Sequence, residues 1–89
     1  ENFHLVIISN LLFGAEHKEQ IVKEAKRILR KGGRALVIDW RGSFGGLGPH
    51  PDHVVTQDHA QTLFELGGFV KQEIVPAGEY HWGIVFKKS

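Results

Sequence analysis

The hydrophobic residues of the chain form two continuous apolar runs with a helical repeat between them. Residues 5–8 and 35–38 are apolar at every position, which is typical of parallel strands covered on both faces. Between them, apolar residues recur at the spacing of one helix face, and these are Ile21, Val22, Ala25, Ile28 and Leu29. We expect the glycine pair 32–33 to end this helix, because glycine adopts the left-handed C-cap conformation at little cost. A right-handed βαβ unit is therefore predicted.

The second half of the chain has the pattern of a long loop, a short helix and a hairpin. Residues 42–53 hold four glycines and two prolines, which argues against regular structure there. A helix is expected over residues 57–66, with Thr56 as its N-cap. Two further strands, over residues 69–75 and 81–87, are joined by a short turn and should be antiparallel. The predicted class is α/β, in the order β-α-β-loop-α-β-β.

Composition limits the size of the protein and its partners. The chain has 89 residues, a formal net charge of +1, and neither cysteine nor methionine. A nearly neutral chain is not expected to bind nucleic acid, and no apolar run approaches the ~20 residues of a membrane span. Without cysteine, disulfides and thiolate metal sites are ruled out. Because the chain starts two residues before a strand of the buried type, we expect it to be part of a longer protein.

Polar residues follow both strands of the predicted βαβ unit. Ser9 and Asn10 come after the first strand, and Asp39, Trp40 and Arg41 close the second. Ligands of open α/β sheets bind outside the carboxyl ends of the strands, so these residues are candidates for a binding site. Ser9 and Asn10 can equally well satisfy backbone groups in a strand-to-helix loop. The residues alone favour that simpler interpretation.

The glycine-rich loop over residues 42–53 is a candidate lid. Loops of this length in compact domains are usually functional or disordered. Its glycines form neither a GxGxxG nor a Walker pattern, and the segment does not lead directly from a strand into a helix. A flexible cover over a substrate pocket is therefore a better prediction than a phosphate cradle.

Histidines and carboxylates gather in this loop and just after it, and they are His50, Asp52, His53, Asp58 and His59. Imidazole and carboxylate groups bind zinc, iron or nickel, but the glutamate of HExxH is missing and the histidines lie in a Gly/Pro loop. The simplest interpretation is a solvated loop followed by a helix start, and no metal site is predicted. His50 and His53 remain candidates for orienting a substrate or accepting its proton.

Three segments, in this order, resemble blocks of the class I S-adenosylmethionine-dependent methyltransferases, and most closely those of the ubiquinone/menaquinone-biosynthesis type. Residues 3–6 (FHLV) are similar to FDxV at the fourth strand, with His4 in place of aspartate. Residues 28–34 (ILRKGGR) are similar to the block RxLKPGGx, with Lys31 where proline is usual. Residues 66–69 (LGGF) are similar to EAGF before the sixth strand. The resemblance covers essentially the whole chain.

The resemblance implies a Rossmann-like sheet of seven strands in the order 3-2-1-4-5-7-6. Residues 1–89 would be one partial domain, the C-terminal half, which supplies strands 4 to 7. The glycine-rich loop and the acidic residue that hold the cofactor in this family would lie in the absent half. The implied cofactor is S-adenosylmethionine, with Ser9, Asn10 and Leu11 as its neighbours. Residues 39–53 would border the acceptor pocket, with Asp39, Trp40 and Arg41 as substrate contacts.

The leading hypothesis is therefore a cytoplasmic parent enzyme that methylates a small molecule, with the 89-residue chain inactive alone. A rival hypothesis is a non-catalytic α/β module that associates through its exposed strand edge. A third, weaker one is a metal protein built on the histidine loop. The strand over residues 4–10 would expose an apolar edge, so we expect it to pair with the missing N-terminal half or, in a homodimer, with a second copy.

Overall fold

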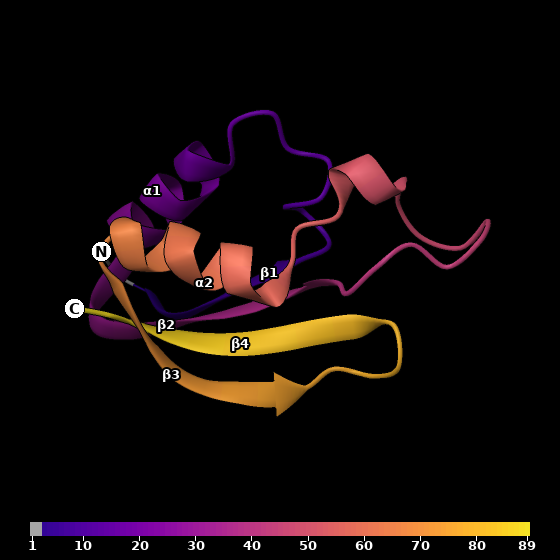
Figure 1. Ribbon diagram of the computed structural model, residues 1–89. Helices are drawn as coiled ribbons and strands as arrows, with labels where there is room; N and C mark the ends of the chain where they lie inside the picture. Colours follow the sequence, from indigo (N-terminus) through magenta and orange to yellow (C-terminus); the bar gives the residue numbers. More distant parts are fainter. Residues whose placement is uncertain (1–2) are drawn as a thin grey trace.

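A computed structural model describes residues 3–89 as one mixed sheet with two α-helices on the same face (Figure 1). Strand order is β1-β2-β4-β3, with β1 parallel to β2, and β4 antiparallel to both of its neighbours. The predicted α/β class, the βαβ unit and the terminal hairpin are confirmed, and the strand order is the 4-5-7-6 that the family resemblance implied. The elements are β1 (Phe3–Ser9), α1 (Lys18–Ile28), β2 (Leu29–Trp40), the 3-10 helix η1 (Pro51–His53), α2 (Gln57–Leu66), β3 (Phe69–Pro76) and β4 (His81–Lys88).

The core lies between the helices and one face of the sheet. Side chains alternate along each strand, so every second residue of β1, β2 and β4 points toward α1 and α2. The buried strand residues on that face include Ile8, Val37, Ile84 and Phe86. No helix among residues 3–89 is both long and apolar enough to cross a bilayer.

The expectation that the strands are covered on both faces is wrong for this chain. Leu5 is 52% exposed and Ile7 is 59% exposed, although both belong to a continuous apolar run. The physical reason is that both helices pack on the same side of the sheet (Figure 1). An apolar run shows that both faces of a strand are suited to burial. Among the described residues, helices pack on only one of these faces.

The glycine pair does not end α1, so that prediction is also wrong. The helix ends at Ile28, and Leu29 already has the extended backbone of β2. Phe3 pairs with Leu29 and Leu5 pairs with Arg34, so residues 30–33 form an outward bulge opposite one residue of β1. Gly32 has a φ of 81° within this bulge, a conformation that favours glycine.

A distant lysine takes over the role expected of the glycine cap. The Nζ of Lys88, at the end of β4, donates hydrogen bonds of 2.6 Å to the carbonyl oxygens of Lys26 and of Leu29. These contacts satisfy acceptors that the end of a helix leaves without an intrahelical partner, and they place a cation at the negative end of its dipole. The end of α1 is thus stabilised by a residue that follows it by about sixty positions.

The second helix forms as predicted. The Oγ1 of Thr56 accepts a 3.1 Å hydrogen bond from the backbone N–H of His59, which is the expected N-cap. Ala60 and Phe64 are fully buried against the sheet, and the helix ends at Leu66 with Gly67 as its C-cap. The ring of Phe64 stacks on that of Phe86 with 4.6 Å between centroids. This stack joins α2 to β4.

Candidate cofactor and acceptor site

The loop after β1 is held against the end of β2 at two points. Asn10 has a φ of 58°, which asparagine tolerates better than most residues, and its N–H donates to the carbonyl oxygen of Ile38 at 2.9 Å. Two residues further on, the N–H of Leu12 donates to Oδ2 of Asp39 at 2.9 Å, and the Leu12 side chain is fully buried. The backbone between these anchors is therefore fixed, while Ser9, Asn10 and Leu11 are exposed at the carboxyl end of β1.

The second predicted group, at the end of β2, separates into one buried residue and two accessible ones. Asp39 is 0% exposed, and its Oδ1 also accepts the N–H of Trp40 at 2.8 Å, so both carboxylate oxygens are engaged with backbone. Its position makes Asp39 a positioning residue for the β1 loop, and its predicted contact with a substrate stays a prediction. Trp40 is half-buried, and Arg41 is exposed.

Aromatic side chains tie the start of the glycine-rich loop to the β3–β4 hairpin. The rings of Trp40 and His81 lie 4.3 Å apart between centroids, and the rings of Phe44 and Tyr80 lie 4.8 Å apart in an edge-to-face arrangement. Phe44 and Leu47 also form a short backbone bridge, and η1 follows, so the loop is less irregular than its composition predicts. The sequence pattern did not predict these contacts of Tyr80 and His81, and the available signal was the position of both residues at the turn of the hairpin.

The two candidate histidines lie on η1 and at its start, both exposed. The Nδ1 of His50 accepts the N–H of Asp52 at 3.2 Å and so caps η1. His53 lines a cavity of about 200 Å³, together with Asp52 and residues of the segment 13–18 that follows the β1 loop. The structure therefore places His53 beside the segment 13–18, and it gives His50 a local structural role as the cap of η1. Among residues 3–89, no group of three or more metal-ligating side chains is gathered.

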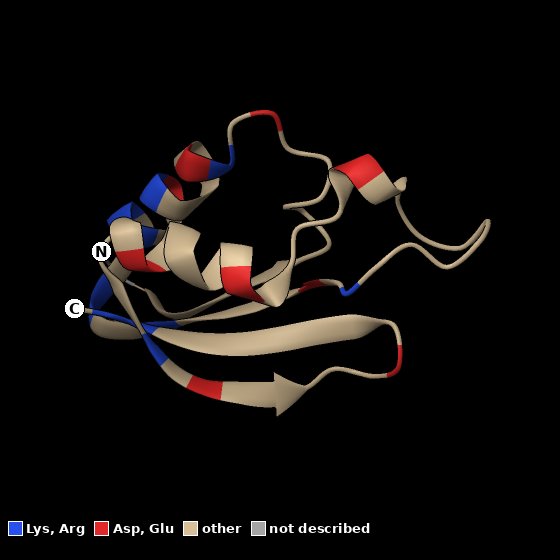
Figure 2. Cartoon of the chain, viewed as in Figure 1, with Lys and Arg blue, Asp and Glu red and all other residues tan. Residues whose placement is uncertain are grey.

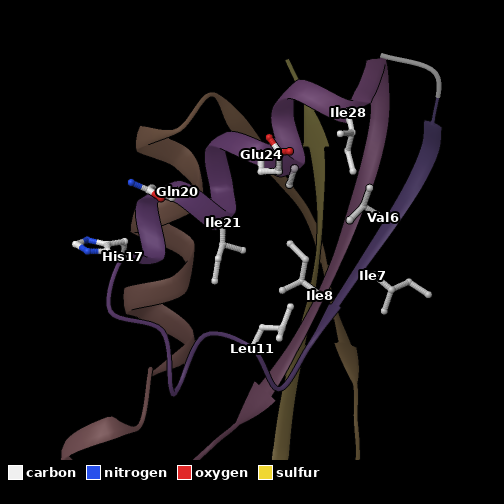
Figure 3. Close-up of a pocket in the computed structure, with 10 residues that line it drawn as sticks. Val6, Ile7, Ile8, Leu11, His17, Gln20, Ile21, Glu24 and Ile28 are labelled. Atoms are coloured by element: carbon white, nitrogen blue, oxygen red, sulfur yellow. The ribbon is translucent and has the colours of Figure 1, made fainter.

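An apolar groove runs between the free edge of β1 and α1 (Figure 3). Its volume is about 410 Å³, and Val6, Ile8, Leu11, Ile21 and Ile28 are among its lining residues. Figure 3 shows Ile8, Leu11 and Ile21 directed toward one another from the strand, the loop and the helix. Within the described chain β1 pairs with β2 alone, so backbone groups along its other edge have no strand partner. The groove and this edge form one continuous surface beside Leu11.

Comparison with known proteins places this fold. No family model and no curated protein matches the chain. A solved structure described as a type 11 methyltransferase from Sulfolobus solfataricus matches with a TM-score of 0.80 and 28% sequence identity, over 96% of this chain and 50% of that protein. A SAM-dependent methyltransferase from Aquifex aeolicus matches with a TM-score of 0.83 and 19% identity, over 96% of this chain and 45% of that one. The structure of PigF with SAH matches with a TM-score of 0.72 and 20% identity, over 97% of this chain and 30% of PigF.

These matches define the architecture as the C-terminal half of a SAM-dependent methyltransferase fold. The two matches below 25% identity bear on the fold alone, and the Sulfolobus protein adds a moderate similarity in sequence. The chain spans about half the length of the first two structures and less of the third.

Proposed function

We propose that the chain is the C-terminal half of an S-adenosylmethionine-dependent methyltransferase that acts on a small molecule. The observation that carries this proposal is the match over 96% of the chain to the Sulfolobus protein described as a type 11 methyltransferase. The segments 3–6, 28–34 and 66–69 support an enzyme of the ubiquinone/menaquinone-biosynthesis type. A cytoplasmic location belongs to the same proposal.

The β1 loop is the proposed cofactor contact. S-adenosylmethionine would lie against Ser9, Asn10 and Leu11, at the carboxyl end of the parallel strands where ligands of such sheets bind. Two backbone anchors, to Ile38 and to Asp39, hold this loop before any ligand arrives. A pre-formed loop loses little conformational entropy on binding, which favours affinity.

The chemistry proposed for the complete enzyme is an in-line displacement at the sulfonium methyl group. The acceptor forms a bond to the methyl carbon while the carbon–sulfur bond breaks, and S-adenosylhomocysteine leaves as a neutral thioether. Such a reaction depends mainly on alignment and on exclusion of water, because the leaving group is already activated. A hydroxyl or acidic carbon acceptor also releases a proton, and His53 or His50 would accept it.

The apolar surface beside Leu11 is the proposed docking place for the other half of the fold. A parallel strand of that half would pair with the free edge of β1, and apolar side chains would enter the groove against Ile8 and Ile21. Support comes from the exposure of Ile7 and from the coverage of the matched structures, about half of which lies outside this chain. The 89-residue chain alone would then lack part of the cofactor site and be inactive.

Calorimetric titration of S-adenosylhomocysteine tests this proposal. We expect binding to the chain once its N-terminal half is restored, and no binding to the 89 residues alone. In the longer protein, Asn10→Asp should weaken binding, while Gln72→Glu, which adds the same charge at an exposed position of β3, serves as a matched control. If the longer protein fails to bind S-adenosylhomocysteine, the methyltransferase proposal is wrong.

One observation favours a second candidate, the non-catalytic association module. Leu5 and Ile7 are more than half exposed on β1, whose second edge has no strand partner among residues 3–89, and such edges promote pairing with another chain. Sedimentation of the 89-residue chain distinguishes the two candidates. A concentration-dependent dimer that Ile7→Lys abolishes, in a protein that binds no S-adenosylhomocysteine at either length, would favour the module.

The histidines of η1 provide a further prediction. Replacing His50 and His53 together with glutamine should lower the methylation rate of the complete enzyme more than tenfold, because general-base catalysis typically contributes about 10²–10⁴-fold. His59→Gln, in the first turn of α2, is the matched control and should leave the rate unchanged. Steady-state methylation rates of the three proteins at one fixed pH would measure this loss. An unchanged rate in the double variant would remove both histidines from the mechanism.

A further inference from the structure

A second cavity lies at the opposite end of β1 from the proposed cofactor loop. Its volume is about 390 Å³, and its walls are residues 30–34 of the β2 bulge with His4 and Lys87. Four of these residues, Arg30, Lys31, Arg34 and Lys87, are cationic at neutral pH, and none of the lining residues described by the structure carries a carboxylate. Figure 2 shows lysine and arginine concentrated at this end of the molecule, where the C-terminus lies. We refer to it as the bulge pocket.

The fold builds the bulge pocket at a place where the backbone itself departs from regular pairing. Residues 30–33 stand opposite His4 alone, which pushes the Arg30–Lys31 segment out of the sheet. A Cβ added to Gly33 would lie 2.8 Å from the carbonyl oxygen of Arg30, so the turn requires glycine there. The position of a Cβ on Gly32 lies 3.9 Å from Cε of Lys87, and a larger residue there would narrow the pocket.

Two cations of the bulge pocket face each other directly across the sheet. Arg34 on β2 is the register partner of Lys87 on β4. Like charges in directly opposed positions destabilise a pair of strands. Both side chains are exposed, and among residues 3–89 neither has an ion pair with a carboxylate. The repulsion between Arg34 and Lys87 destabilises the folded chain, and an anion bound between the two side chains would remove this repulsion.

The neighbouring charges are engaged elsewhere, so they do not neutralise the bulge pocket. Glu24 makes two hydrogen bonds of 2.7 Å with Arg27, which lower the pKa of the Glu24 carboxyl. Lys88 covers the carbonyl oxygens at the end of α1 and thereby offsets the negative end of the helix dipole. Arg30 donates a hydrogen bond of 3.4 Å to Nδ1 of His4, and an imidazole that accepts through this nitrogen carries no negative charge to offset the guanidinium. Four cationic residues are therefore gathered in one pocket, although the formal net charge of the whole chain is only +1.

We propose that the bulge pocket binds the phosphate or diphosphate group of a small molecule. Guanidinium groups such as those of Arg30 and Arg34 bind phosphate oxygens in pairs, and Lys87 adds a mobile point charge. A small ligand fits the volume of the pocket, and a formal net charge of +1 does not favour binding of a polyanion. The site lies at the other end of the sheet from Ser9, so it is separate from the proposed methyl transfer.

Calorimetric titration of inorganic pyrophosphate into the 89-residue chain at low salt tests the bulge pocket. The double variant Arg34→Gln/Lys87→Gln should bind at least about tenfold more weakly, because each removed cation takes away a charge-assisted hydrogen bond. Lys23→Gln/Lys71→Gln removes the same charge from exposed positions outside the pocket and should bind within about twofold of the original chain. Equal weakening in the two variants, or no binding to the original chain, would overturn the proposal.

Thermal unfolding separates lost binding from lost structure. Without pyrophosphate, the Arg34→Gln/Lys87→Gln variant should unfold at the same temperature as the original chain or above it, since a repulsive pair is gone. With pyrophosphate, only the original chain and the Lys23→Gln/Lys71→Gln control should gain in Tm. A variant that unfolds earlier without ligand would instead give the two cations a structural role and contradict the proposal.

The source of the phosphate group is addressed with two further probes. Vesicles that contain phosphatidylserine and a single-stranded oligonucleotide each present the same chemistry on a macromolecular surface. We expect pyrophosphate to bind and both larger probes to bind no more tightly per phosphate. Tighter binding of either, lost in the Arg34→Gln/Lys87→Gln variant, would replace the small-molecule assignment.

Discussion

Replacing Phe64 with alanine is expected to lower the free energy of unfolding by about 3–5 kcal/mol, the largest effect of any single change proposed for this chain. The Phe64 side chain is 0% exposed, stacks on Phe86, and meets Phe69 edge-to-face with 5.4 Å between centroids. Its removal leaves a cavity in the core between α2 and the sheet. A domain of this size buries a smaller share of its surface than a large one, so little stability is left to absorb the loss.

Urea unfolding followed by circular dichroism measures this effect. The Phe64→Ala variant should be partly or fully unfolded in the absence of urea. Leu66→Ala is the matched control, because Leu66 belongs to the same helix but is 84% exposed, and its replacement should change stability by no more than about 0.5 kcal/mol. Equal urea midpoints for the two variants would show that α2 does not contribute to the core in the way the structure implies.

Replacing Asp39 with asparagine should destabilise the chain by about 1.5–3 kcal/mol, because hydrogen bonds to a charged group are worth that much. The Asp39 carboxylate accepts two backbone N–H groups, and an asparagine side chain presents only one oxygen to them. Its amide nitrogen would face either the N–H of Leu12 or that of Trp40. The contact that joins the β1 loop to the end of β2 is then weakened or lost.

Hydrogen exchange at the Leu12 amide reports this loss directly. We expect Asp39→Asn to raise the exchange rate of the Leu12 amide by a larger factor than the exchange rates of the core amides of β2. The rise at the β2 amides reports the change in global stability, so the excess at Leu12 reports the lost contact. In the complete protein the same variant should bind S-adenosylhomocysteine at least about tenfold more weakly, a loss equivalent to 1.4 kcal/mol. Asp58→Asn, at an exposed position in α2, is the control. An unchanged exchange rate at Leu12 would contradict the positioning role of Asp39.

The helices and strands of this protein can be predicted from its sequence because the residues that indicate each one lie within it or next to it. The apolar repeat from Ile21 to Leu29 places α1, Thr56 marks the start of α2, and the short turn before His81 predicts the antiparallel hairpin. Each signal lies within the element it predicts or next to it, and each reflects a preference of the chain for one backbone conformation. The parallel pairing of β1 and β2 follows from the helix that joins them.

The glycine pair shows where local reasoning fails. Gly32 and Gly33 have the composition of a helix C-cap, yet they form a bulge inside β2. The end of α1 is stabilised by Lys88 from the last strand, and no local pattern near Ile28 signals that contact. A glycine can adopt backbone φ and ψ angles that other residues avoid, and the packing around it determines which of these angles it adopts.

The candidate site is predictable as a place and not as a set of contacts. The carboxyl ends of β1 and β2 do bring Asn10 and Asp39 to one edge of the sheet, as the topology requires. The sequence does not reveal that Asp39 is buried and bonded to the β1 loop, or that His53 lies beside the segment 13–18 while His50 caps η1. These details depend on distances between segments that are far apart along the chain.

The sequence by itself determined the order and type of the elements, the parallel start, the antiparallel end and the resemblance to a methyltransferase half. These follow from periodicity, capping and turn length, which act over a few residues. Only the tertiary structure decided that one face of the sheet stays open, that Asp39 holds the β1 loop, and that Arg34 lies opposite Lys87. Such contacts form when segments that are distant in the sequence pack together. The burial of a side chain and the charge around it then depend on both segments.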